Sequence, residues 1–351
     1  MQAIAHFKQQ ILDAAAAGGT LRIRGGGTKD WYGQDFGGEI LDTRAHSGIV
    51  DYEPTELVIT ARCGTPLAEI EAALAERGQV LAFEPPHFGA GATLGGAIAS
   101  GLSGPGRASA GAVRDFVLGA VLLDGRGELL NFGGTVMKNV AGYDVSRLLA
   151  GSLGTLGVIV QHSIKVLPRA VCTTTLRFSL SEIDALRTLN EWGRLPLPLS
   201  ASCWHDGVLS VRLAGAQAAV SAAARDLGGE RDDGAAAFWA DLREQRHAFF
   251  AGERALWRLS VPPAAGALVL GAPQLIEWGG AQRWLRLDTD AAAARKLRAV
   301  VTAAGGHATL FRGGDKSVGV FQPLAPAVAA ISARLKAAFD PSQIFNPGRM
   351  I

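Results

Sequence analysis

The sequence predicts an α+β protein with two domains, and three observations support this fold class. The chain has 351 residues, which exceeds the size at which one hydrophobic core usually stops growing. Short strand-like and helical segments alternate along it. Glycine is concentrated in the first half: residues 85–157 contain 17 of the 45 glycines, and apolar segments run between them. Glycine at this density, without a Gly/Ser linker pattern, indicates tight turns and close backbone contacts.

The first half contains one helix near its start and a second one in the middle. Ile4, Phe7, Ile11 and Leu12 fall on one helical face. Thr65 and Pro66 are expected to cap and begin the second helix, 66–77, which Gly78 ends. Asp124-Gly125 is a turn signal between two strands and predicts a hairpin. The expected strands are 21–24, 40–42, 49–52, 57–61, 116–123, 128–132 and 158–166, and a short helix is expected over 145–150.

The second half is less rich in glycine and has alanine-rich helical stretches. The expected helices are 218–227, 235–250, 291–304 and 325–339, and the expected strands are 171–178, 208–213, 284–287 and 318–321. We therefore place a first domain over 1–170, a second α+β domain over 171–324, and a carboxy-terminal helix and tail over 325–351.

Composition and charge argue against several classes of protein. The 34 basic and 32 acidic residues are scattered, so no basic stripe marks a nucleic-acid interface. Cys63, Cys172 and Cys203 lie far apart and form no C-x-x-C spacing, so we expect neither a bound metal nor an iron–sulfur cluster in this chain. The start lacks a signal-peptide pattern, and no apolar run is long enough to span a membrane. A cytoplasmic location is expected, with membrane association only through partners.

The glycine segments do not match the two common phosphate motifs. The sequence has no G-x-G-x-x-G and no Gly-Lys dipeptide, which argues against a Rossmann dinucleotide site and a P-loop. Several separated loops remain. Each is suited to present consecutive backbone N–H groups to an anion, and a large bent dinucleotide needs several such loops.

The order of these loops resembles the vanillyl-alcohol-oxidase-type (PCMH-type) FAD-binding flavoproteins. The resemblance is carried by Arg24-Gly25-Gly26-Gly27-Thr28, Ala92-Thr93-Leu94-Gly95-Gly96, Arg114-Asp115-Phe116-Val117-Leu118-Gly119, Gly142-Tyr143-Asp144 and Gly151-Ser152-Leu153-Gly154-Thr155-Leu156-Gly157. The end of the chain, 339–341 and 346–350, is similar to the glycolate oxidase and D-lactate dehydrogenase branch. The stretches 305–312 and 320–323 are similar to the smaller FAD-binding subunits of bacterial glycolate oxidases.

The resemblance implies a two-subdomain FAD-binding domain, an α+β cap domain with an antiparallel sheet, and a tail that returns to the FAD domain. The first loop and 93–101 would hold the pyrophosphate, 154–159 would line adenine and ribose, and Asn139 and Tyr143 would lie toward the flavin. Arg349 could neutralise a flavin phosphate or a carboxylate substrate. The implied cofactor-binding residues are Arg24, Gly25, Gly26, Gly27, Thr28, Thr93, Gly95, Gly96, Ser100, Gly101, Asn139, Gly142, Tyr143, Gly154, Gly157, Ile159 and Arg349.

Two positions depart from the family or decide its chemistry. Thr28 stands where relatives often carry the histidine that binds flavin covalently, so FAD is expected to be dissociable. Leu153 stands where relatives usually have a glutamate.

The resemblance implies an FAD-dependent oxidoreductase that works beside a larger flavoprotein and an iron–sulfur subunit. The substrate implied is a small 2-hydroxy acid such as glycolate. Two alternatives stay open: a non-catalytic FAD-binding subunit of that complex, and a stand-alone D-2-hydroxy-acid dehydrogenase. No catalytic residue can be named, because the seven histidines form no cluster in the sequence. Trp239, Trp257, Trp278 and Trp284 are expected in the core or at an interface.

Overall fold

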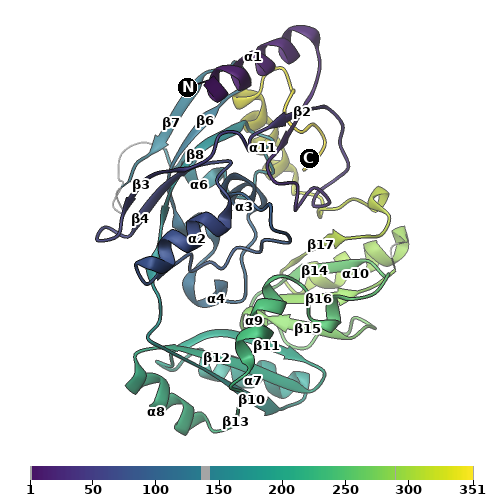
Figure 1. Ribbon diagram of the computed structural model, residues 1–351. Helices are drawn as coiled ribbons and strands as arrows, with labels where there is room; N and C mark the ends of the chain where they lie inside the picture. Colours follow the sequence, from purple (N-terminus) through teal and green to yellow (C-terminus); the bar gives the residue numbers. More distant parts are fainter. Residues whose placement is uncertain (1, 136–142, 289, 351) are drawn as a thin grey trace. The chain divides into compact units, whose positions relative to one another are not determined.

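The computed structural model describes residues 2–135, 143–288 and 290–350, and the chain divides into two compact units (Figure 1). Unit 1 comprises Met1–Leu102, Ala112–Pro168 and Pro323–Ile351, and unit 2 comprises Ser103–Gly111 and Arg169–Gln322. Segment Ser103–Gly111 thus groups with the second unit although it lies within 1–170 in sequence. Within the described ranges, no helix is both long and apolar enough to cross a bilayer.

Unit 1 is built on a five-stranded antiparallel sheet and a parallel pair of strands. The large sheet has the order β3-β4-β8-β6-β7, and β1 pairs in parallel with β2. The strands of unit 1 are β1 (Leu21–Arg24), β2 (Glu39–Asp42), β3 (Ile49–Glu53), β4 (Val58–Arg62), β5 (Gln79–Val80), β6 (Val117–Leu123), β7 (Leu129–Gly133), β8 (Val158–Lys165) and β9 (Leu167–Pro168). Its helices are α1 (Gln2–Ala17), α2 (Leu67–Glu76), α3 (Leu94–Ser100), α5 (Val113–Phe116), α6 (Val145–Leu148) and α11 (Pro326–Phe339).

The carboxy-terminal tail completes the core of unit 1. Phe7 and Ile11 of α1 pack in one cluster with Leu21 of β1 and with Ile344 and Phe345 of the tail, and all five are at most 1% exposed. The backbone continues this contact, because the Leu21 N–H donates to the Ile344 carbonyl. Figure 1 shows the end of the chain beside α1 and β2. Residues more than 300 positions apart therefore share one core.

Unit 2 is an eight-stranded antiparallel sheet covered by helices. The strand order is β13-β10-β12-β11-β15-β16-β14-β17. The strands are β10 (Cys172–Ser179), β11 (Leu199–His205), β12 (Val208–Gly215), β13 (Glu230–Arg231), β14 (Leu256–Ser260), β15 (Gln274–Glu277), β16 (Gln282–Arg286) and β17 (His307–Arg312). The helices are α4 (Arg107–Ala110), α7 (Glu182–Trp192), α8 (Gln217–Leu227), α9 (Ala235–Arg243) and α10 (Ala291–Ala303), with 3₁₀ turns at Ala248–Phe250, Trp278–Gly280 and Lys316–Val318.

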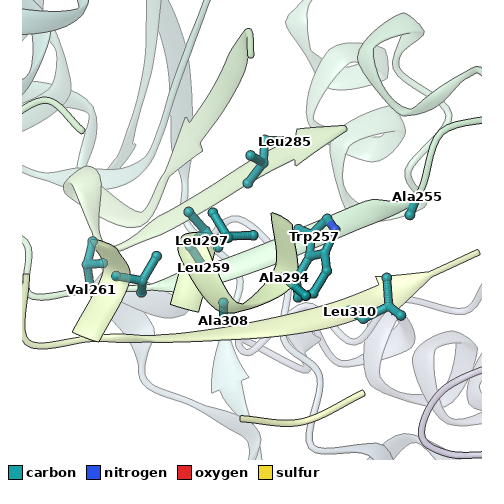
Figure 2. Packing of buried hydrophobic residues seen from close by; sticks show 10 residues of the cluster. Ala255, Trp257, Leu259, Val261, Leu285, Ala294, Leu297, Ala308 and Leu310 are labelled. Atoms are coloured by element: carbon teal, nitrogen blue, oxygen red, sulfur yellow. The ribbon is translucent and has the colours of Figure 1, made fainter. Parts of the chain in front are cut away.

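The second core lies between α10 and the β14, β16 and β17 strands. Figure 2 shows Trp257 and Leu259 of β14 packed with Leu285, Leu297 and Leu310. All four tryptophans named above are buried, at no more than 8% exposure, which confirms that they belong to the interior.

Three local expectations about helices need correction. Leu12 is 40% exposed and does not join the buried face of α1. Pro66, not Thr65, is the N-cap residue of α2, because the Thr65 hydroxyl bonds with the backbone of Gly48. The helix expected over 235–250 ends at Arg243, since Gln245 has a left-handed backbone (φ 53°) that a helix cannot contain.

The strand expected at 318–321 is wrong. Lys316–Val318 form a 3₁₀ turn and Gly319 has φ 82°, so the apolar residues at this point do not extend into a ladder. Val320 accepts one backbone hydrogen bond, from Leu310 of β17. The sequence patterns also failed to predict α7, β11, β14, β15 and β17.

Candidate cofactor-binding site

The loop after β1 forms the floor of a cavity in unit 1. A Cβ on Gly26 would lie 1.5 Å from the Gly91 carbonyl oxygen, and one on Gly25 would lie 2.5 Å from Thr93 Oγ1. Gly27 has φ 73°, a left-handed conformation that favours glycine. The two glycine-rich segments therefore lie backbone against backbone, which no larger residue would allow.

The second wall comes from α3. Thr93 caps this helix, since its Oγ1 accepts from the Gly96 N–H at 3.3 Å. A Cβ on Gly95 would approach Cys63 Cβ to 2.8 Å, so glycine lets the helix start pack against the segment after β4. Gly101 ends α3 with φ 66°, and a Cβ there would meet Gly151 at 2.7 Å.

The third wall is the loop 151–157, which the tail fastens. Leu153 has φ 52°, and its N–H donates to the Ala99 carbonyl at 2.8 Å. Asn346 Nδ2 donates to the Leu153 carbonyl at 2.6 Å, while its Oδ1 accepts from the Ile23 N–H at 2.9 Å. Asn346 is 1% exposed and so joins β1 to this loop from inside the cavity wall.

Charged side chains give the cavity a positive lining. Arg24 Nε lies 2.7 Å from Asp30 Oδ2, and Arg22 Nη2 lies 2.9 Å from the same oxygen. Arg349 is 8% exposed and donates to the Lys29 and Tyr32 carbonyls, both at 3.3 Å. Burial lowers the pKa of Arg349 to about 10, so it stays charged at neutral pH. Among the described lining residues, the cations Arg24, Lys29 and Arg349 outnumber the carboxylate of Asp30 by two.

Most of the residues implied by the resemblance line this cavity: Arg24, Gly25, Gly26, Gly27, Thr28, Thr93, Gly95, Gly96, Ser100, Gly154, Gly157, Ile159 and Arg349. Gly101 does not line the cavity and is the C-cap residue of α3. Tyr143 is 93% exposed and does not line the cavity. Asn139 and Gly142 lie outside the described residues.

Further lining residues were not predicted: Ile23, Lys29, Asp30, Thr43, Cys63 and Asn346. Ala99, from the predicted segment 93–101, and Leu153, which departs from the family, also line the cavity. Lys29 and Asp30 follow the first glycine loop directly, and this adjacency was a signal that could have found them. Thr43, Cys63 and Asn346 come from other elements and leave no local pattern. Burial raises the pKa of the Cys63 thiol to about 12, so it is protonated at neutral pH and no nucleophile.

The histidines of unit 2 give no metal site. The rings of His205 and His247 are 5.6 Å apart, and each has a backbone partner. Across the described part of the chain, no three His, Cys, Asp or Glu side chains gather as a metal would require.

The cavity fits the phosphates of a dinucleotide. A pyrophosphate carries two negative charges, which match the net charge of the lining, and guanidinium groups bind phosphate oxygens well. The glycine floor lets a ligand approach the backbone closely. These two observations support a dinucleotide such as FAD.

Comparisons with known proteins agree with this geometry. Residues 4–133 match a family model described as an FAD binding domain. The chain is similar in fold to alkyldihydroxyacetonephosphate synthase, with a TM-score of 0.67 over 97% of this chain and 75% of that one, at 15% identity. The chain therefore has an α+β PCMH-type fold and binds FAD.

Curated relatives are similar over different lengths. Glycolate oxidase subunit GlcE of Escherichia coli (strain K12) is 48% identical over 97% of this chain and 95% of its own length. D-lactate dehydrogenase of Archaeoglobus fulgidus is 34% identical over 51% of this chain and 40% of its own. Glycolate oxidase subunit GlcD of Bacillus subtilis (strain 168) is 30% identical over 42% and 32%. Because the first of these similarities spans nearly both full chains, this chain belongs to the glycolate oxidase subunit GlcE family.

Proposed function

We propose that this chain is the FAD-binding subunit of a glycolate oxidase complex, and hence part of an FAD-dependent oxidoreductase that acts on a 2-hydroxy acid. One observation carries the proposal: the 48% identity to a glycolate oxidase subunit over almost the whole of both chains. The D-lactate dehydrogenase relative covers half of this chain, so it supports a shared FAD domain more than a shared substrate.

The cavity residues supply the binding half of this function. Arg24–Thr28 and Thr93–Gly101 hold the pyrophosphate in our proposal, and 154–159 line adenine and ribose. Asn139 and Tyr143 are assigned to the flavin side, Gly142 is assigned to cofactor binding, and Arg349 neutralises a phosphate or the substrate carboxylate. Bound FAD supplies the redox chemistry by accepting a hydride or an electron pair. Thr28 cannot form a histidyl bond, so the cofactor is held non-covalently.

The proposed complex contains a larger flavoprotein subunit and an iron–sulfur subunit. Cys63, Cys172 and Cys203 stand in three separate segments, the turn after β4, β10 and β11, so electrons would leave this chain's flavin through a partner. We place the complex in the cytoplasm, in contact with the inner membrane through its partners.

Anaerobic addition of substrate tests the proposal. The purified chain is expected to show flavin absorbance, and the complex with its flavoprotein partner should lose this absorbance when glycolate is added. Bleaching of the isolated chain by glycolate would assign substrate oxidation to this chain. Bleaching only after the partner is added would make this subunit an electron relay or a structural FAD carrier. A purified chain that is colourless and takes up no added FAD would contradict the proposal.

Substrate specificity is tested in the same experiment with purified protein. Turnover by the chain alone with D-lactate and an artificial acceptor, but not with glycolate, would favour a stand-alone D-2-hydroxy-acid dehydrogenase instead.

A further inference from the structure

The carboxy-terminal helix α11 exposes an apolar stripe. Leu324 precedes the helix, and Val328, Ile331 and Leu335 follow at spacings of four, three and four residues. Leu324, Val328 and Ile331 are 47%, 48% and 57% exposed. This spacing places the side chains on one face and is the pattern by which one helix receives another. Leu335 packs against the core of unit 1, so the exposed part of the stripe is formed by Leu324, Val328 and Ile331.

A cavity of about 550 Å³ adjoins the stripe within unit 1. Leu335 lines it from α11, and Leu156 lines it from the loop 151–157. Its rim carries Leu148 and Met350, which are 42% and 40% exposed. Polar residues also line the cavity: Ser152, Thr155, Ser332, Lys336, Gln343 and Asn346. An exposed apolar stripe beside a cavity with leucine and methionine side chains in its lining is an arrangement in which a bulky side chain of a partner becomes buried at an interface.

The charge of α11 argues against a second copy of this chain as the occupant. Residues 323–339 contain Arg334 and Lys336 and no Asp or Glu. The Lys336 ammonium is engaged by Asp340 and by the Thr155 and Phe345 carbonyls, whereas the Arg334 side chain is exposed beside the stripe. A second copy of this chain would add another helix with cations and no acid. A partner helix with acidic residues beside its apolar face would neutralise Arg334.

We propose that α11 and this cavity dock an amphipathic, acid-flanked helix of the larger flavoprotein subunit. The inference rests on the proposed function, because that function supplies the partner. On the inner side of α11, Lys336 Nζ donates a hydrogen bond to the Thr155 carbonyl at 2.7 Å and so joins the helix to the loop 151–157. Substitutions on the outer side therefore leave the FAD site intact, and FAD content reports whether a variant is folded.

The test is co-expression of the full chain with the larger flavoprotein subunit of its own complex. Assembly is measured by native mass spectrometry and by titration of the chain with the larger flavoprotein subunit. The FAD content of each variant is measured in parallel. Ile331→Glu should weaken assembly about 30-fold or more, as expected for a central interface residue. Arg334→Glu should weaken it less and remove much of its salt dependence. The matched control is Ile183→Glu on α7, where the isoleucine is 66% exposed, and it should leave assembly unchanged.

Three outcomes would overturn the inference. Assembly of Ile331→Glu at wild-type strength, with wild-type FAD content, would show that α11 is not the docking surface. Concentration-dependent dimerisation of the wild-type chain that Ile331→Glu abolishes would make a second copy the occupant. If the wild-type chain itself fails to assemble with the flavoprotein, the proposed function fails first, which separates the two proposals.

Discussion

Gly26 shows how strictly one residue is determined by its surroundings. The 1.5 Å between a Cβ added at this position and the Gly91 carbonyl oxygen involves backbone on both sides, so no side chain can turn away to relieve it. We expect Gly26→Ala to displace the loop and raise the dissociation constant for FAD about 100-fold or more, as measured by flavin fluorescence titration.

Gly37 provides the matched control for this substitution. It lies in the same unit, no atom lies within 4 Å of its added Cβ, and its backbone does not require glycine. Gly37→Ala should bind FAD like the wild type. Equal affinities for Gly26→Ala and Gly37→Ala would show that the glycine floor does not hold the cofactor.

Asn346 is the second residue whose substitution is informative. Asn346→Ala would leave the Leu153 carbonyl and the Ile23 N–H without this partner, at a cost of about 1–3 kcal/mol for each buried group. Since these groups belong to two walls of the cavity, FAD affinity should fall by more than the stability of the apo-protein explains. Calorimetric FAD titration together with denaturant unfolding of the apo-form measures both, with exposed Asn131 on β7 as the control. Unchanged affinity in Asn346→Ala would refute this role.

At this scale the sequence predicted what is local. Glycine loops could be foreseen because each glycine contributes through its own backbone, and most of them do line the cavity. Asn346 and Thr43 could not be found in this way, because they reach the site through contacts with segments far away in sequence. Tyr143 belongs to one of the predicted motifs but is exposed and does not line this cavity, so its place toward the flavin stays a prediction.

Among the elements, β8 carries a buried titratable group. His162 is fully buried, and its Nδ1 lies 3.2 Å from the Gly119 carbonyl oxygen on β6, so Nδ1–H is the donor in the neutral ring. Nε2 has no hydrogen-bond partner among the described residues. Burial lowers the pKa of His162 from 6.5 to about 4.

This depressed pKa makes stability depend on pH in a definite direction. The unfolded chain takes up a proton below pH 6.5, whereas the folded chain resists until about pH 4. The free energy of unfolding therefore keeps its full contribution from His162 above pH 6.5. It falls by about 3 kcal/mol in all as the pH falls from 6.5 toward 4. Urea unfolding at pH 7 and pH 5 should show a smaller loss for His162→Leu than for the wild type. Identical losses in the two proteins would exclude His162 as the cause.

Element types were predicted better than element ends. The hairpin at Asp124 was recognisable because its carboxylate accepts from the Arg126 and Glu128 N–H groups, a local turn device. The true end of α9 depends on the left-handed backbone of Gln245, which is uncommon for glutamine and gives no signal in the sequence. Strands β14 and β17 were missed because tertiary packing around Trp257, rather than alternation, stabilises them.

The whole molecule has a discontinuous first unit. Its core requires residues from both ends of the chain, and the tail also supplies Asn346 and Arg349 to the cofactor cavity. Resemblance to a known family could suggest this return of the tail, whereas local patterns could not, because contacts across some 300 residues leave no periodicity. The same segment therefore contributes to stability and to cofactor binding at once.

Removal of the tail tests this coupling. Deletion of 342–351 takes away Ile344 and Phe345, each fully buried, and each such loss costs about 2–5 kcal/mol. We expect the truncated chain to lose FAD and the hydrogen-exchange protection of β1 and α1. Protection of β14 and β16 should persist, because the core of unit 2 contains no residue of the tail. Deletion of 350–351 alone keeps Arg349 and should bind FAD normally. If the longer deletion also retained FAD at wild-type affinity, the tail would not be part of the binding site, and Asn346 and Arg349 would have to be reassigned to a purely structural role.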